Sequence, residues 1–236
     1  MALPPINVEW HFDEEMGTLS FEGTGAMPRN EWAHLSDKVA SIVIGEGITK
    51  IADSAFHGFG KAETVTLPST LTSIGKFAFY GCGIKELNIP GSVERIGEGA
   101  FKSCGELRSC DIWGNISVLE PVTFGYCSSL QSVWFMGEGL TELKKDCLQA
   151  CGQINTLVIP GSVTSMEKIG AEGVKVLVFR GEPPAMPQDP DTGEYFTEFE
   201  HLTRVYYPEG STKWPEIAKL CREDVLWVEG IPQDGA

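Results

Sequence analysis

Apolar residues return at a fixed interval along most of this chain. The dipeptide Ala55-Phe56 recurs as Ala78-Phe79 and Ala100-Phe101, and in altered form as Thr123-Phe124 and Cys147-Leu148, so equivalent positions are 22 to 24 residues apart. A short apolar-x-apolar segment keeps the same phase, at 42–44, 65–67, 87–89, 110–112, 133–135 and 157–159. Six copies are therefore visible between about residues 39 and 170. Repetition at this interval is typical of solenoid proteins.

Each copy is expected to contribute one short strand to a parallel sheet. Alternate side chains of the apolar-x-apolar segment face the same side, and the proline or glycine that usually follows ends the strand. A single coil cannot bury its own apolar edge, whereas stacked coils turn each column of equivalent residues into a continuous core. The pattern predicts a mainly β fold with short helical turns, in which six repeats stack behind one parallel sheet.

The third copy carries a family resemblance. Its sequence, Leu87-Asn-Ile-Pro-Gly-Ser-Val-Glu-Arg-Ile-Gly-Glu-Gly-Ala-Phe-Lys-Ser-Cys104, resembles the BspA-like leucine-rich repeat, whose pattern is close to L-x-I-P-x-S-V-x-x-I-G-x-x-A-F-x-x-C. The second copy is similar over residues 66–75, and the match weakens in copies four to six, where Trp113 and Met136 replace the proline. The resemblance implies a right-handed leucine-rich-repeat solenoid of a type associated with adhesion to host proteins and other cells.

The chain is expected to form one continuous solenoid domain with three parts. These are an N-terminal β cap over 1–38, the BspA-like repeats over 39–173, and irregular repeats with a C-terminal cap over 174–236. Residues 6–23 indicate two strands around a turn. Beyond residue 173, the segments 176–181, 205–210 and 225–228 indicate further strands, residues 214–220 a short helix, and residues 183–197 a surface loop rich in Pro and Asp.

Charge and hydropathy exclude two classes of partner. The chain has 18 Lys+Arg and 33 Asp+Glu, a formal net charge of −15, which repels phosphate backbones and anionic lipid headgroups. We expect no nucleic-acid partner. No stretch reaches the roughly 20 apolar residues that span a bilayer, so no membrane insertion is expected. The first five residues lack the basic and apolar regions of a secretory signal, and the printed chain is not expected to carry an export signal of its own.

The chemistry-bearing residues form no recognisable catalytic motif. The four histidines are scattered, and neither G-x-S-x-G nor H-E-x-x-H occurs, so we expect no enzyme and no cofactor. Four cysteines, Cys82, Cys104, Cys127 and Cys151, share one column, which allows either a metal site or simple packing. Zinc needs ligands that converge on a point, whereas a column spreads them along a line, and Phe59 fills the same place in the first copy. We therefore predict unpaired, metal-free thiols.

The outward positions of the predicted sheet single out copies four and five. The side chain between the two buried positions of a strand points outward, and this column reads Val43, Thr66, Asn88, Asp111, Trp134 and Val158. With the next outward place added, copies four and five present two tryptophans, a methionine and a carboxylate, residue types that protein interfaces contain. The predicted partner-binding residues are Asp111, Trp113, Trp134 and Met136. The alternative is that the loop after residue 181 covers them and makes them core.

Residues and resemblance together predict a non-catalytic recognition module. We expect it to bind a host or bacterial surface protein through its sheet face, as a monomer. The resemblance implies an extracellular or cell-surface location in a bacterium. The alternative function is an intracellular protein-interaction scaffold, located in the cytoplasm, that uses the same face.

Overall fold

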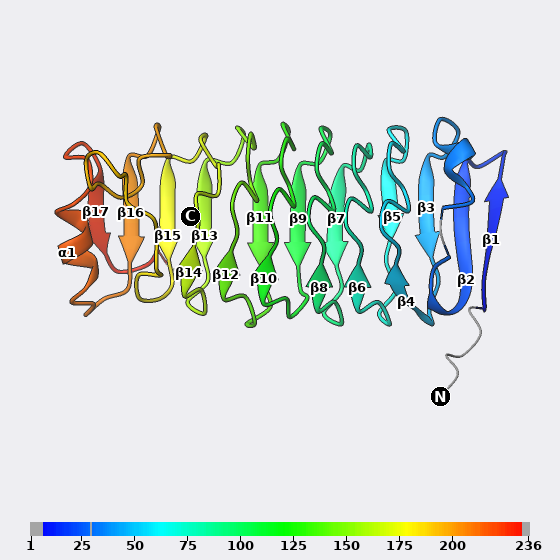
Figure 1. Cartoon of the computed structure of the whole chain (residues 1–236), viewed down its shortest axis with the longest axis horizontal. Helices are drawn as coiled ribbons and strands as arrows, with labels where there is room; N and C mark the ends of the chain where they lie inside the picture. Colours follow the sequence, from blue (N-terminus) through cyan, green and yellow to red (C-terminus); the bar gives the residue numbers. More distant parts are fainter. Residues whose placement is uncertain (1–6, 29, 233–236) are drawn as a thin grey trace.

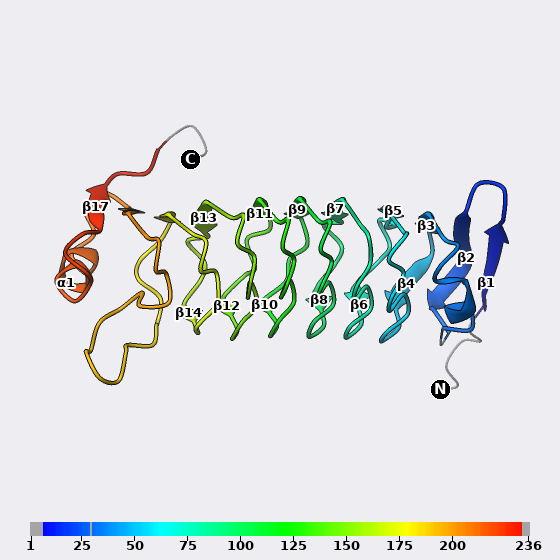
Figure 2. The same cartoon turned by 90° about the horizontal axis from the view of Figure 1, so that it is seen from above.

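The computed structural model describes residues 7–28 and 30–232. Its strands stand side by side along one axis and form an elongated solenoid, with β1 at one end and α1 at the other (Figure 1). Each coil contributes a strand of three or four residues to a front sheet. Most coils contribute a second, usually shorter strand to a back sheet, which runs along the opposite side of the solenoid (Figure 2). The predicted stack of repeats is thus confirmed.

The strand boundaries follow the repeat closely. The front sheet contains β3 (Ser41–Ile44), β5 (Thr64–Thr66), β7 (Glu86–Ile89), β9 (Ser109–Ile112), β11 (Ser132–Phe135), β13 (Thr156–Ile159), β15 (Val176–Phe179), β16 (Arg204–Tyr207) and β17 (Leu226–Glu229). The back sheet contains β4 (Ile48–Ile51), β6 (Ser73–Ile74), β8 (Arg95–Ile96), β10 (Val118–Leu119), β12 (Glu142–Leu143) and β14 (Ser165–Met166). The six predicted strand segments lie on β3 to β13.

Both ends of the solenoid are closed by other elements. At one end β1 (Asn7–Asp13) pairs antiparallel with β2 (Thr18–Ala26), which in turn pairs with β3 and β4 and so starts both sheets. A 3-10 turn, η1 (Ala33–Leu35), follows, and a short helix, α1 (Trp214–Ala218), lies at the other end. The boundaries of the three predicted parts remain a prediction, and residues 1–6 and 233–236 of the predicted caps lie outside the described residues.

A buried tryptophan covers the core near each end. The indole N–H of Trp32 donates to the carbonyl of Ala55 at 2.7 Å, and that of Trp214 donates to the carbonyl of Gly181 at 2.9 Å. Both side chains are fully buried. Because a buried indole needs a partner for its N–H, each tryptophan both covers apolar surface and satisfies a carbonyl of the adjoining coil.

The core is a set of columns, of which the phenylalanine column is the clearest. The rings of Phe56, Phe79, Phe101 and Phe124 stack in sequence, with centroid separations of 5.1, 5.4 and 5.5 Å and interplanar angles of 18° or less. All four side chains are fully buried. Each ring is therefore packed by its equivalents in the coils on either side, which explains why the apolar position recurs.

The cysteine column has a backbone partner that the sequence did not indicate. The thiols of Cys82, Cys104, Cys127 and Cys151 each donate to the carbonyl of the column phenylalanine in the preceding coil, at 3.1 to 3.2 Å. All seven cysteines are free thiols in this structure. Each of these carbonyls also accepts the backbone N–H of the residue three positions later. The column thus gives each of its buried thiols a hydrogen-bond acceptor.

Thiol reactivity tests this arrangement. Burial raises the pKa of Cys82, Cys110 and Cys147 well above the ordinary value, and it raises the pKa of the half-buried Cys221 to about 11. Because the thiolate is the reactive form, we expect Ellman's reagent at pH 8 to modify Cys221 slowly and the other thiols only after unfolding. Denaturant without reductant should then expose seven reactive thiols. A lower count, or stoichiometric zinc in the purified protein, would contradict the prediction.

The front sheet departs from the expected continuous sheet at two places. Strands β5 and β7, and strands β11 and β13, follow each other in order but do not form hydrogen-bonded pairs. In both places the later strand is followed by a proline, Pro90 or Pro160, which has no N–H to donate. Pro68 and Pro208 have a milder effect, because the β3–β5 and β15–β16 pairings that precede them cover three residues instead of four.

Where the residue after a front strand is not proline, its N–H adds a further hydrogen bond to the row of backbone bonds, here called the ladder, that joins the strand to the preceding one. The N–H of Trp113 donates to the carbonyl of Ile89 at 3.0 Å, and the N–H of Met136 donates to that of Ile112 at 2.8 Å. The corresponding pairings, β7–β9 and β9–β11, cover four residues each. The residue after each front strand therefore decides whether that strand is fully joined to the preceding coil.

Candidate binding surface

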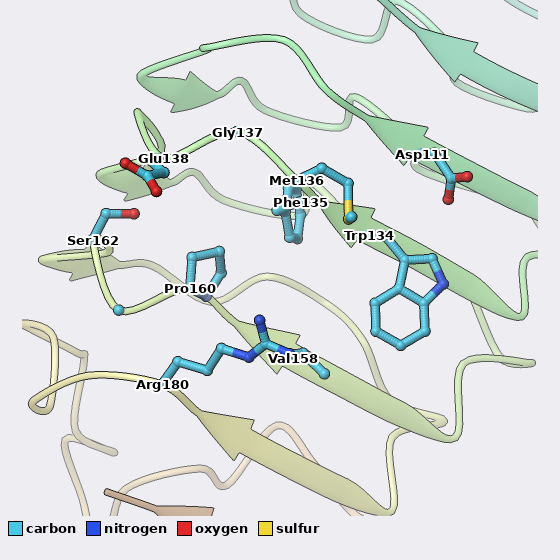
Figure 3. A pocket seen from close by; sticks show the side chains of 11 residues that line it. Asp111, Trp134, Phe135, Met136, Gly137, Glu138, Val158, Pro160, Ser162 and Arg180 are labelled. Atoms are coloured by element: carbon cyan, nitrogen blue, oxygen red, sulfur yellow. The ribbon is translucent and has the colours of Figure 1, made fainter. Parts of the chain in front are cut away.

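The predicted binding residues lie on the front sheet at β9 and β11. Asp111 and Trp134 are direct partners in the parallel register of these two strands, and their side chains stand beside each other on the outer face of the sheet (Figure 3). Trp113 and Met136 follow the ends of the same strands. Alternation along the strands produces this arrangement, because Cys110, Ile112 and Val133 take the inward positions and are buried.

The loop over residues 182–201 does not cover this surface. Trp113 is 50% exposed and Met136 is 49% exposed. The loop instead extends the back sheet, where the N–H of Ala185 donates to the carbonyl of Thr164 at 2.8 Å. Glu198 fixes the far end of the loop by accepting backbone N–H groups at 3.0 and 3.3 Å, and burial raises the pKa of its carboxyl. The two outermost side chains are thus not part of the core.

A cleft of about 820 Å³ opens beside Trp134. It is bounded by Asp111 on β9 and by Arg180 after β15, and between them by residues of β11, β13 and the segments that follow these strands: Trp134, Phe135, Met136, Gly137, Glu138, Val158, Pro160, Gly161 and Ser162. Three of the four predicted residues therefore come together in one site, and Trp113 lies outside its lining.

The cleft coincides with the interruption between β11 and β13. Just before most front strands, a backbone N–H donates to the equivalent carbonyl of the preceding coil, as Gln131 does to Arg108 and Lys175 does to Asn155, each at 2.9 Å. The equivalent bond, from the N–H of Asn155 to the carbonyl of Gln131, is missing, although residues 131–155 are all described. Because Pro160 has no N–H, the carbonyl of Phe135 also lacks its ladder donor. The separated strands leave a hollow with an unpaired backbone acceptor in its wall.

Three charged side chains surround the cleft without internal partners. Asp111 stands at the β9 side, Glu138 follows Met136, and Arg180 follows β15 and reaches over Val158 (Figure 3). Among the described residues none of the three side chains forms an ion pair or a hydrogen bond. Unpaired charges of both signs beside an aromatic ring can bind polar groups of a partner.

Sequence reasoning missed Glu138 and Arg180. Arg180 occupies the place that Trp113 and Met136 hold in earlier coils, but its coil departs from the repeat consensus and was not aligned with the other six. The sequence signal is the apolar segment 176–179 directly before Arg180. The structure pairs β15 with β13 over four residues and so places residue 180 beside residue 160. Glu138 lies in the segment that follows Met136, where the repeat pattern carries little information.

The described part of the chain offers neither a metal site nor a membrane-spanning helix. No group of three or more His, Cys, Asp or Glu among residues 7–28 and 30–232 could hold a metal ion. Within the same residues no helix is both long enough and apolar enough to cross a membrane. The surface around Trp134 combines a cleft with exposed apolar side chains and with charged side chains.

The repeats belong to a known family. The model of the BspA-type leucine-rich repeat region matches residues 49–170 in six copies. Because the match covers half of the chain, this protein belongs to the family of BspA-type leucine-rich-repeat proteins. A search of the curated proteins finds no match.

Solved structures of bacterial leucine-rich-repeat proteins are similar to this chain. A leucine-rich repeat protein from Bacteroides ovatus has a TM-score of 0.54 and 18% sequence identity, over 97% of this chain and 79% of that one. A leucine-rich cell surface protein from Faecalibacterium prausnitzii has a TM-score of 0.39 and 16% identity, over 92% and 97%. The leucine-rich repeat protein of T. pallidum has a TM-score of 0.41 and 17% identity, over 87% and 81%. At these identities the first likeness shows the fold alone.

Proposed function

We propose that this protein is a non-catalytic recognition module that binds a partner protein through the front sheet at β9, β11 and β13. We further propose that it acts at a bacterial surface or after secretion, in adhesion to another protein. The family supports the general part of this proposal, because leucine-rich-repeat proteins are typically interaction modules.

The single observation that supports this surface is the uncovered cluster of Trp113, Trp134 and Met136. Exposed aromatic and methionine side chains that lie together beside a hollow are uncommon on a protein that has no partner. Interface centres are enriched in these residue types, and tryptophan is frequent among the residues that contribute most to affinity. The charged side chains around the cleft supply the polar rim that such centres have.

A comparative capture experiment tests the proposal. Immobilised wild-type protein and the triple variant W113A/W134A/M136A are exposed in parallel to extracts of candidate host cells and bacteria. We expect at least one protein to be retained by the wild type and lost with the triple variant, and that protein is then purified and titrated by calorimetry. The control is Tyr126→Ala, which removes an aromatic side chain of similar exposure (49%) from the turns that lead from β10 to β11.

Two outcomes would oppose the proposal. If the triple variant retains the same purified partner with unchanged affinity, the binding surface lies elsewhere on the molecule. Proteolytic shaving of intact source cells tests the surface location, and uncleaved cytoplasmic markers show that the cells stayed intact. If the protease then leaves this protein uncleaved as well, the surface location is wrong. Thermal unfolding of each variant shows whether a loss of binding reflects a loss of folded protein.

A further inference from the structure

The charges around the cleft lie in an order that a partner has to match. Asp111 and Arg180 stand on opposite sides of the cleft, on β9 and just after β15, with β11 and β13 between them. Three strand steps of about 4.8 Å or more, one of them across the interruption between β11 and β13, and two residues along the strand, about 6.6 Å, separate their backbones by at least about 16 Å. The cleft therefore has a carboxylate at its β9 end and a guanidinium at its β15 end, and Glu138 adds a second carboxylate to the lining.

We infer that the cleft binds an extended segment of a partner protein that carries a lysine or arginine at the Asp111 end and an aspartate or glutamate at the Arg180 end. This inference rests on the proposed function and names the chemistry of the partner at the same site. An extended chain advances about 3.3 Å per residue, so the two charged residues of the partner are roughly five or six positions apart.

The β9 end of the cleft is built for a cationic side chain. Asp111 and Trp134 are direct partners on adjacent strands, so a cation placed over the indole ring lies beside the carboxylate as well. A cation above a tryptophan face is attracted by the electron density of the ring, and Asp111 has no cation of its own among the described residues.

The middle and the β15 end of the cleft fit the rest of such a segment. Between the two charges lie Val158 and Pro160, which offer an apolar surface without hydrogen-bond donors of their own side chains. The carbonyl of Phe135 faces the cleft without its ladder donor and can accept an N–H from the partner's backbone. Arg180 is exposed and without an ion pair in the described part of the chain, and a guanidinium binds a carboxylate through two parallel hydrogen bonds.

These features favour a peptide over a carbohydrate. A neutral sugar would stack on Trp134, but it would leave formal charges of both signs unmatched on either side. A segment with one basic and one acidic residue neutralises both ends at once. A carbohydrate ligand is therefore an outcome that would overturn the inference.

Selection from a phage library of random dodecapeptides on the wild-type protein tests the inference. We expect the enriched sequences to contain a basic and an acidic residue separated by roughly five or six positions. A synthetic peptide of this kind should bind about fivefold more weakly to Asp111→Asn and to Arg180→Gln, the size expected for partly exposed ion pairs. Changing the peptide's basic residue to methionine should abolish the effect of Asp111→Asn, and changing its acidic residue to glutamine should abolish that of Arg180→Gln.

The controls separate this inference from the proposed function. Glu106→Gln and Arg95→Gln remove exposed charges away from the cleft and should leave peptide affinity unchanged. If peptides bind and lose affinity with Trp134→Ala but not with Asp111→Asn or Arg180→Gln, the proposed surface stands and the charge pairing is wrong. If no peptide is enriched, the inference is wrong, and the capture experiment alone decides the proposed function. If a glycan array gives the ligands instead, both are wrong.

Discussion

Replacing Trp134 by alanine is expected to weaken partner binding by roughly thirtyfold. Truncation of a tryptophan at the centre of an interface typically costs about 2 kcal/mol or more, and this ring stands in the wall of the cleft, beside Asp111. Trp134 lies on the outer face of the sheet and is only half-buried. The melting temperature should therefore change little, and calorimetric titration of the purified partner gives the affinity.

Trp113 provides an internal comparison for this prediction. Because its side chain lies outside the lining of the cleft, Trp113→Ala should cost less affinity, below about tenfold, as truncations away from an interface centre do. Tyr126→Ala should cost none. The interpretation fails if Trp134→Ala lowers the melting temperature by many degrees while the remaining folded protein binds normally, because the ring would then serve the fold.

Phe101→Ala is expected to lower the free energy of unfolding by about 3–5 kcal/mol, as truncation of a buried phenylalanine does. Its ring is fully buried, and its centroid lies 5.4 Å from that of Phe79 and 5.5 Å from that of Phe124. The substitution leaves a cavity in the middle of the stack and removes packing from both neighbouring coils. Urea denaturation followed by circular dichroism measures the difference.

A conservative variant sharpens the second prediction. Leu148 occupies the same column in a later coil and is also fully buried, so Phe101→Leu should cost clearly less than Phe101→Ala. A loss below about 1 kcal/mol for Phe101→Ala would mean that the column is not a principal source of stability. Equal losses for the two variants would mean that the column requires a ring at this coil.

The repeats could be predicted because every position in a core column needs an apolar side chain that packs against its equivalents in the adjoining coils. Phe79 is packed by Phe56 and Phe101, so the apolar residue must return in each coil, and its interval reveals the solenoid from the sequence alone. The cap elements were found only approximately, since the segment predicted as a helix over 214–220 forms α1 over Trp214–Ala218. Caps meet their neighbours on one side only, and no column constrains their sequence.

The interruptions of the front sheet could not be predicted from the columns. The prolines are visible in the sequence, yet proline also follows β5 and β16, where it only shortens the pairing. Whether the loss of one N–H separates two strands depends on how the adjoining coils are packed. The cleft, with Glu138 and Arg180 around it, therefore required the structure.

Two features distinguish Trp113 and Met136 from the proline that they replace: a backbone N–H that can donate a hydrogen bond, and a large side chain. Both residues donate N–H groups that join their coils to the preceding ones, at 3.0 and 2.8 Å. Gly45 and Arg180 donate in the same way, at 2.8 and 3.0 Å, so the backbone requires only a residue that is not proline. The choice of a large aromatic and a methionine is not explained by the ladder, and it is this choice that supports a binding role.

The interruptions in the two sheets are offset from each other. The front sheet is open between β5 and β7 and between β11 and β13, whereas the back sheet is open between β8 and β10. At each opening the opposite sheet is joined, by β6–β8, β12–β14 and β7–β9 respectively. The phenylalanine stack also continues across the first two of the three openings along the chain, from Phe56 to Phe124.

Because the openings are offset, every pair of neighbouring coils at an opening is still joined through the opposite sheet. In a stacked array, neighbouring units unfold together only as far as the contacts between them couple their stabilities. Here no cross-section through the openings cuts both sheets at once, so no plane divides the solenoid into blocks that could come apart independently. At the cleft, the paired strands β12 and β14 of the back sheet keep the two adjoining coils joined, so the front sheet can be open there without dividing the solenoid.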